Sequence, residues 1–411
     1  MASSDQRNDH ENTLANPMAW SIWLLAVIFV AYKFQTQSSY AVLNSSIAES
    51  FSLSLAQISI IGSLYSFAYA IMTILVGGLL DRYGLRVTMI GGLTIVVAGG
   101  TLFGFANNIP SLALGQILLG VGGAFGFPGL AYAVREWFSI KHFGLVFGVA
   151  QLVAAGANTL GQAAVGYLIV EFEWAYIIFI QAAFGFALLV PFILLMREPF
   201  NNSTPFSSSQ GSLWESLFRD LKILLVQPIF WQVSLISGIT FGTLLGIGIV
   251  WGIKLLVAKG FDPTTASSIN SILWISLGIG ALAIHLVSDY LRSFKLSVII
   301  FLVCDIVAIS YLVLSDEISI SMAYVIFAAI GFFAGVNAVA FTITTRFCDK
   351  AISGTAFGLL TSMSFIVAAA LTPLPAKIIE WTGTPLELAS LIFPLALLLA
   401  LFLALLKKET Y

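Results

Sequence analysis

The sequence has very little charge, because Lys, Arg, Asp and Glu make up only 9% of its 411 residues, against about 25% in a soluble domain. Its two cysteines are too few for a disulfide framework. The 18 Lys and Arg are balanced by 20 Asp and Glu, so there is no basic surplus to neutralise phosphates. Together with 59% hydrophobic residues, these absences exclude a soluble globular protein, a disordered protein and a nucleic-acid binder.

Motifs of catalysis and metal binding are also missing. The three histidines are scattered, and no HExxH, Walker-type or GxSxG stretch is present. An enzyme would show a clustered site of His, Asp and Glu at one face. We therefore expect no enzymatic activity, no metal and no cofactor.

Long apolar runs fill most of the chain. A membrane-spanning helix needs about 20 apolar residues, and the runs are continuous rather than alternating, which disfavours a β-barrel. The fold class is therefore an all-α membrane protein with twelve transmembrane helices. We expect these near 19–43, 57–80, 87–106, 110–133, 144–170, 174–196, 228–257, 267–287, 296–314, 320–344, 352–378 and 386–406.

The distribution of Lys and Arg predicts the orientation. Most of them fall in the tails and loops of one side when both termini are placed in the cytoplasm. The first residues lack the charged-then-apolar pattern of a cleaved signal peptide. The predicted parts are a disordered tail at 1–18, six-helix halves at 19–196 and 228–406, a polar linker at 197–227 and a tail at 407–411.

The two halves resemble each other at an offset of about 210 residues. Phe147-Gly148, for example, recurs as Phe357-Gly358. An even number of helices in each half means that both halves enter the membrane from the same side. The pseudo-twofold axis then runs along the membrane normal, which is typical of rocking transporters.

The segment 77–86 reads Gly-Gly-Leu-Leu-Asp-Arg-Tyr-Gly-Leu-Arg and resembles the G-x-L-x-D-R-x-G-R-R loop of the major facilitator superfamily. Leu85 departs from the pattern, since a basic residue is usual there. The resemblance implies that Asp81 docks on the start of the helix at 352–378, with Arg135 nearby, and latches the cytoplasmic side. The alternative is that Asp81 and Arg82 are ordinary charged loop residues. The candidate gating residues are Asp81, Arg82, Arg86, Arg135, Asp289 and Arg346.

The resemblance implies a secondary transporter that works by alternating access in a bacterial inner membrane. Gln116 stands where many members carry Arg, and the stretch 156–162 lacks the Gly-Pro pair of drug antiporters. The stretches 251–256 and 266–274 are similar to phagosomal nutrient transporters, which take up amino acids or nucleosides. We expect a monomer that takes up a small polar solute (an amino acid, a nucleoside or an organic anion) with a proton or sodium. The alternatives are an exporter of a drug-like or siderophore-like molecule, or a receptor without transport.

Polar residues within the spans are the main functional candidates, because burying a charge in the bilayer is costly. Lys33 lies near the middle of the first span, and Gln37 and Tyr40 share its helix face. Lys33 could bind a carboxylate or phosphate or carry a proton; the alternative is snorkelling or a structural ion pair. The remaining binding candidates are aromatic and polar residues: Tyr65, Tyr69, Asn158, Gln162, Trp251, Lys254, Asn270, Trp274 and Asn337.

Asp305 is the only acidic residue deep in a predicted span. It could be a proton site for ion coupling. Its helix belongs to the outer ring that the resemblance implies, so a structural hydrogen bond to a neighbouring helix is the favoured interpretation.

Overall fold

The computed structural model describes residues 16–138, 142–198, 213–347 and 353–406. Every regular element in this part of the chain is helical. Twelve helices are long and apolar enough to cross a membrane, and each overlaps one predicted apolar run. The predicted all-α fold with twelve transmembrane helices is therefore confirmed.

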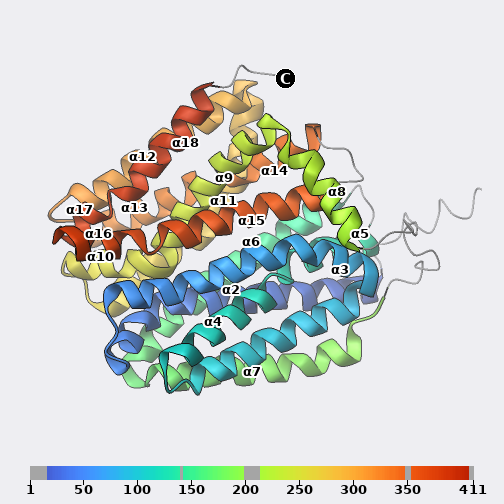
Figure 1. Cartoon of the computed structure of the whole chain (residues 1–411), viewed down its shortest axis with the longest axis horizontal. Helices are drawn as coiled ribbons and strands as arrows, with labels where there is room; N and C mark the ends of the chain where they lie inside the picture. The colour runs from blue at the N-terminus through green and yellow to red at the C-terminus, as the bar shows by residue number, and fades with distance from the viewer. Residues whose placement is uncertain (1–15, 139–141, 199–212, 348–352, 407–411) are drawn as a thin grey trace, which may run out of the picture.

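The first half of the bundle is coloured blue to green in Figure 1. Its helices are α2 (Pro17–Ser50), α3 (Leu55–Gly104), α4 (Ile109–Gly123), α5 (Gly126–Trp137), α6 (Phe143–Glu171) and α7 (Trp174–Leu195). Helix α3 holds two spans, Leu55–Leu80 and Arg82–Gly104, which meet at a kink where Gly84 has φ of 78°. Helices α4 and α5 together make one span.

The second half is coloured yellow to red in Figure 1. Its elements are α8 (Leu213–Leu225), α9 (Pro228–Gly246), the π-helical turn η2 (Ile247–Trp251), α10 (Gly252–Ala258), α11 (Pro263–Leu291), α12 (Phe294–Leu314), α13 (Ile320–Phe333), α14 (Val336–Phe347), α15 (Ser353–Leu371), α16 (Leu374–Thr382), α17 (Leu386–Ala389) and α18 (Ile392–Leu406). Helix α8 lies within the predicted linker and buries Leu224 against Phe230 and Ala356.

Local signals explain where the helices begin. The Asn16 side chain accepts the N–H of Met18 at 3.0 Å, and Pro17 occupies the first turn of α2, where its missing N–H costs nothing. Ser54 and Gln57 form a capping box at the start of α3. Helix α2 therefore begins inside the predicted tail 1–18, whose residues 1–15 lie outside the described chain.

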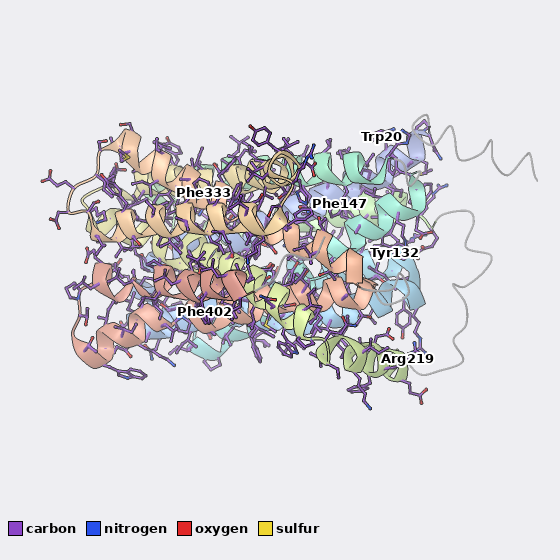
Figure 2. The ribbon with its side chains drawn as sticks, turned by 90° about the horizontal axis from the view of Figure 1, so that it is seen from above. Trp20, Tyr132, Phe147, Arg219, Phe333 and Phe402 are labelled. Carbon is purple, nitrogen blue, oxygen red and sulfur yellow. The ribbon has the colours of Figure 1, made fainter. Side chains whose placement is uncertain are left out.

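The bundle has two ends. We call the end where α2 begins and α18 ends the terminus end, and the opposite end the far end. Figure 2 shows Arg219 of α8 at the terminus end and Phe402 of α18 on the flank. Phe402 is 56% exposed, as expected of a side chain that faces lipid rather than water.

The halves meet chiefly along three helices of the first half, α2, α3 and α6. Helix α3 packs on α15, α6 packs on α11, and α2 packs on η2 and α10. Helices α7, α12 and α18 lie outside these contacts in Figure 1. Near the centre of the bundle, α2, α3 and α5 of the first half lie close to α9 and α15 of the second half. We call this region the central site.

Candidate functional site

The middle of α2 carries two polar side chains one helical turn apart. Lys33 is 0% exposed and Gln37 is 4% exposed. Residues four apart lie on the same face of a helix, so both point into the bundle together. The sequence predicted this shared face, and the structure buries it completely.

Three aromatic rings surround the Lys33 ammonium. Nζ lies 3.8 Å from the ring centroid of Phe34, 4.8 Å from that of Phe127 and 4.9 Å from that of Tyr69. Gly126 leaves room for the lysine, because a Cβ there would lie 3.3 Å from Cγ of Lys33. Ring faces attract a cation, so this cage partly offsets the loss of water around the ammonium.

The polar groups at this site have no protein partner. Within the described residues, no hydrogen-bond partner exists for Lys33 Nζ, for either polar atom of Gln37, or for the hydroxyls of Tyr65 and Tyr69. An unsatisfied buried polar group costs about 1–3 kcal/mol, and an unpaired charge costs several. Such an arrangement is expected where a ligand with a negative charge and hydrogen-bond acceptors completes the site.

An aromatic stack connects this site to the second half. The Tyr69 ring lies 3.8 Å from the Phe365 ring of α15, with an angle of 20° between the planes. Tyr65 stacks behind Tyr69 at 6.0 Å, and Phe241 of α9 meets Phe365 edge-on at 6.1 Å. Tyr69 therefore touches both the lysine and the opposite half of the molecule.

Two predicted binding residues, Tyr40 and Asn158, form hydrogen bonds to neighbouring helices. Tyr40 donates its hydroxyl to the carbonyl of Ile58 at 2.5 Å. Asn158 accepts the hydroxyl of Ser38 at 2.5 Å. Their hydrogen bonds join neighbouring helices, which gives these two residues a structural role within the first half.

Three other predicted residues, Trp251, Asn270 and Asn337, form hydrogen bonds within the second half. Trp251 donates its indole N–H to the carbonyl of Thr372 at 2.7 Å. Asn337 accepts the hydroxyl of Ser237 at 2.5 Å. Asn270 donates to the carbonyl of Gly248 at 2.9 Å, and its Oδ1 has no partner among the described residues.

Hydrogen bonds between the halves join α6 to α11 and α2 to α10. Trp274 of α11 donates to Oε1 of Gln162 on α6 at 2.7 Å. Lys254 of α10 donates to the hydroxyl of Ser45 on α2 at 3.0 Å. Three predicted binding residues, Gln162, Lys254 and Trp274, thus take part in hydrogen bonds between the halves.

Asp305 lies away from the central site. It is 1% exposed on α12, which packs on α11, α13 and α18. A hydrogen bond to a neighbouring helix is expected from the sequence, yet its Oδ1 has no partner among the described residues. The carboxyl group is therefore buried in the outer part of the second half, apart from Lys33.

The predicted gating residues lie at the terminus end. Arg86 donates its guanidinium to the carbonyl of Ile193 at 2.8 Å, and Arg135 pairs with Glu136 at 2.9 Å. Arg82 lies over the ring of Tyr83. Asp289 is exposed near the end of α11, while the side chains of Asp81 and Arg346 lie outside the described residues.

Glu198 organises the loop that carries the family-like motif. Its carboxylate accepts the backbone N–H groups of Leu85 at 3.1 Å and Arg86 at 2.7 Å. These N–H groups begin the second span of α3, where a negative charge is favoured. Gly84 has a positive φ, and a Cβ there would lie 2.5 Å from the Glu198 carboxylate, so this position requires glycine.

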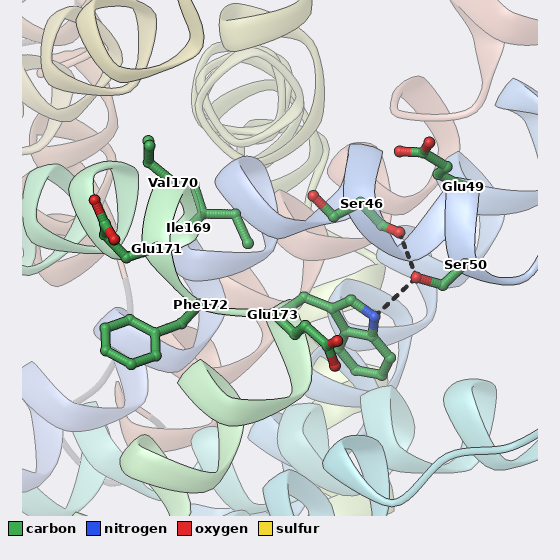
Figure 3. Close-up of a pocket in the computed structure, with 9 residues that line it drawn as sticks. Ser46, Glu49, Ser50, Ile169, Val170, Glu171, Phe172 and Glu173 are labelled. Carbon is green, nitrogen blue, oxygen red and sulfur yellow. Dashed lines mark hydrogen bonds between the residues drawn. The ribbon is translucent and has the colours of Figure 1, made fainter.

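A separate pocket of about 520 Å³ opens at the far end between α2, α6 and α7. Trp174 donates its indole N–H to the hydroxyl of Ser50 at 3.1 Å. This hydroxyl in turn donates to the carbonyl of Ser46, and Figure 3 shows the bond between these two serines. Three carboxylates line it, from Glu49, Glu171 and Glu173. They would repel an anion, so this pocket differs in charge from the central site.

Phe34, Phe127 and Phe365 were not predicted as site residues. The chain contains 33 phenylalanines, and most phenylalanines in a membrane bundle pack against lipid or the core. Phe34 follows Lys33 directly in the sequence, so its position near the lysine could have been predicted. The contacts of Phe127 and Phe365 depend on packing between helices far apart in sequence.

The chain matches known proteins over most of its length. The family model described as Major Facilitator Superfamily matches residues 23–373. The chain is 21% identical to "Probable galactarate/D-glucarate transporter GudP" of Escherichia coli, with 88% of each chain covered. It is 31% identical to "Nitrate/nitrite transporter NrtP" of Picosynechococcus over 39% of this chain and 29% of that protein. Several other curated relatives are also matched over less than half of their own length.

A solved structure shares the fold. The inward-facing, unoccupied structure of a bacterial homologue of the human lysosomal transporter Spinster has a TM-score of 0.76 to this chain. Its sequence identity is 16%, and the match covers 95% of this chain and 97% of the other. This likeness concerns the arrangement of the twelve helices.

Proposed function

The chain belongs to the Major Facilitator Superfamily, and from this premise we propose that it carries a small carboxylate anion across the membrane by alternating access. The observation that carries the proposal is the Lys33 ammonium, fully buried and without a partner among the described residues. A carboxylate supplies the missing charge. Its two oxygens also accept hydrogen bonds from Gln37 and the hydroxyls of Tyr65 and Tyr69.

The names of the relatives support an anionic substrate. GudP is named for two sugar diacids and NrtP for nitrate and nitrite. These substrates are all anions, although their sizes differ. The named substrates carry two charges in GudP and one in NrtP, so these names support a negative charge on the substrate but not a particular number of charges.

The proposed cycle uses the two sets of contacts between the halves. Lys254–Ser45 and Trp274–Gln162 join the halves at the far end, and Tyr69–Phe365 joins them beside Lys33. Rocking of the halves would break one set at a time and expose Lys33 to one side only. Since both halves of the site come from one chain, a monomer is sufficient.

We place the protein in a bacterial inner membrane with both termini in the cytoplasm, since Lys and Arg gather at the terminus end. The direction we propose is uptake. An anion that enters a cell moves against an inside-negative potential, at a cost of about 2.3 kcal/mol per charge and 100 mV. Co-transport with a proton or sodium would offset this cost.

A thermal-shift screen of the purified protein tests the proposal, because a ligand that binds the native state raises the unfolding temperature. The panel holds carboxylic acids, amino acids, nucleosides and inorganic anions. We expect carboxylates to stabilise the wild-type protein and to lose this effect in Lys33→Met. Stabilisation by a nucleoside alone, or an equal carboxylate shift in Lys33→Met, would refute the proposal.

A further inference from the structure

We infer that the central site selects a carboxylate that carries a single negative charge, and that it discriminates against dicarboxylates and against zwitterionic amino acids. This inference rests on the proposed function and narrows its substrate class. The charged side chains that can reach a ligand beside Lys33 determine which ligand charges the site accepts.

Lys33 is the one cation at the central site among the side chains that the structure describes. The next lysine towards the far end, Lys254, contacts Ser45 on α2, twelve residues beyond Lys33. At 1.5 Å per residue, this is about 18 Å along the helix. That length far exceeds the distance between the carboxylates of a small diacid. A second carboxylate would therefore be buried without a counter-charge, which is strongly unfavourable.

Among the residues that the structure describes, no carboxylate pairs with Lys33 or lies beside it to receive a substrate ammonium. Asp305 is buried on α12, which packs on α11, α13 and α18, whereas α2, α3 and α5 surround Lys33. The faces of Phe34, Tyr69 and Phe127 already lie around the lysine ammonium. A second ammonium brought close would meet repulsion from Lys33 without a compensating carboxylate.

The remaining groups are neutral and suit uncharged polar substituents. The Gln37 amide and the hydroxyls of Tyr65 and Tyr69 can each donate and accept. They can satisfy the second carboxylate oxygen and a hydroxyl or keto group beside it. The arrangement therefore fits a monoanion, including a hydroxylated one.

Matched pairs of ligands test the inference on the wild-type protein at neutral pH. The pairs are D-gluconate against D-glucarate, monomethyl succinate against succinate, and L-lactate against L-alanine. Each pair keeps the carbon skeleton nearly constant and changes one charged group. We expect the monoanion of each pair to bind at least tenfold more tightly in calorimetry or thermal-shift titration.

The outcomes separate this inference from the proposed function. If diacids bind as tightly as monoacids, the site still takes carboxylates but the single-charge rule is wrong. If L-alanine matches L-lactate, the exclusion of zwitterions is wrong. If no carboxylate of any pair binds, both the proposed function and this inference fail.

A second cation placed beside Lys33 provides a gain-of-function test. Gln37→Lys adds an ammonium one helical turn away on the same face, so we expect the preference to move at least tenfold towards succinate and D-glucarate. Gln37→Met is the control, because it keeps the length of the side chain without the charge and should still prefer monoanions. An unchanged preference in folded Gln37→Lys would contradict the inference, and the wild-type pairs decide the matter if that variant does not fold.

Discussion

The centres of the two halves differ although the halves repeat the same fold. At the offset of about 210 residues, Lys33 of α2 corresponds to Thr243 of α9, and both side chains are buried. Phe127 contacts the Lys33 ammonium, whereas its counterpart Asn337 bonds to Ser237 within the second half. The first half thus holds the charge, and its counterpart in the second half is neutral.

The second half shows a different specialisation in the same place. Where α2 runs as one helix, the corresponding span of the second half contains the π-helical turn Ile247–Trp251. Trp251 bonds to the carbonyl of Thr372, and Asn270 bonds to the carbonyl of Gly248. Such turns often occur at functional sites. The two halves therefore share their helices but differ at the centre, where the first half holds a buried lysine and the second half holds a π-helical turn.

The largest expected effect comes from removing the central charge. Lys33→Met should abolish uptake into proteoliposomes, because the substrate anion loses its counter-charge. It should also raise the stability of the ligand-free protein by about 1–4 kcal/mol, since an unpaired buried ion is replaced by an apolar side chain. Thermal unfolding and uptake of a labelled carboxylate measure the two effects.

Lys254→Met is the matched control at the far end. Its ammonium already has a partner in Ser45, so the stability of the protein should not rise in the same way. If Lys33→Met transports normally, the assignment of the anion site to the first half is wrong. A large loss of stability in Lys33→Met would instead indicate a structural role for the lysine.

The second effect concerns the Tyr69 hydroxyl. Tyr69→Phe keeps the ring stacked on Phe365 but removes an unpartnered hydroxyl at the ligand site. We expect KM to rise about tenfold with a smaller change in kcat, which is the loss of one hydrogen bond to a charged ligand. Concentration-dependent uptake measures both constants.

Tyr40→Phe serves as the comparison for Tyr69→Phe. Its hydroxyl bonds to the carbonyl of Ile58, so its removal should lower stability and leave KM unchanged. An equal KM in wild type and Tyr69→Phe would show that the Tyr69 hydroxyl does not bind the substrate.

The third effect concerns the contacts between the halves. Trp274→Phe removes the hydrogen bond to Gln162 at the far end, which is worth about 1 kcal/mol. The population should shift about fivefold towards the state that is open at that end. Ser271→Cys, in a background without the two native cysteines, reports this opening through its rate of labelling by a membrane-impermeant maleimide, because Ser271 is buried in this structure.

A control variant separates opening from general loosening. Trp23 bonds to the carbonyl of Val146 within the first half, so Trp23→Phe should lose a similar bond without changing the labelling rate. Equal rates in wild type and Trp274→Phe would show that the far-end contacts do not hold the halves closed.

The fold and part of the site could be predicted from the sequence. The length and composition of each apolar run determine where a helix can span the membrane, which explains the agreement over twelve spans. Lys33 could be predicted as a candidate because a charged residue within an apolar span is costly to bury. The hydrogen bonds of the Asn158 and Gln162 side chains with Ser38 and Trp274 could not be predicted. Such pairing depends on helices more than a hundred residues apart, so no local pattern reveals it.

The smallest expected effect lies at the loop of the terminus end, far from the charge. Glu198→Ala leaves the N–H groups of Leu85 and Arg86 without their acceptor, which should cost about 1–2 kcal/mol of stability. Thermal unfolding measures this loss. In uptake assays the preference for monoanions should stay as in wild type, because Glu198 does not contact Lys33 or the residues around it.

Gly84→Ala should lower the stability of the protein as well, since its Cβ would collide with the Glu198 carboxylate. In the double variant the second substitution should cost less than it does alone, because the carboxylate is then absent. Fully additive losses would show that the two residues act independently, and a changed ligand preference would show that the loop reaches the central site.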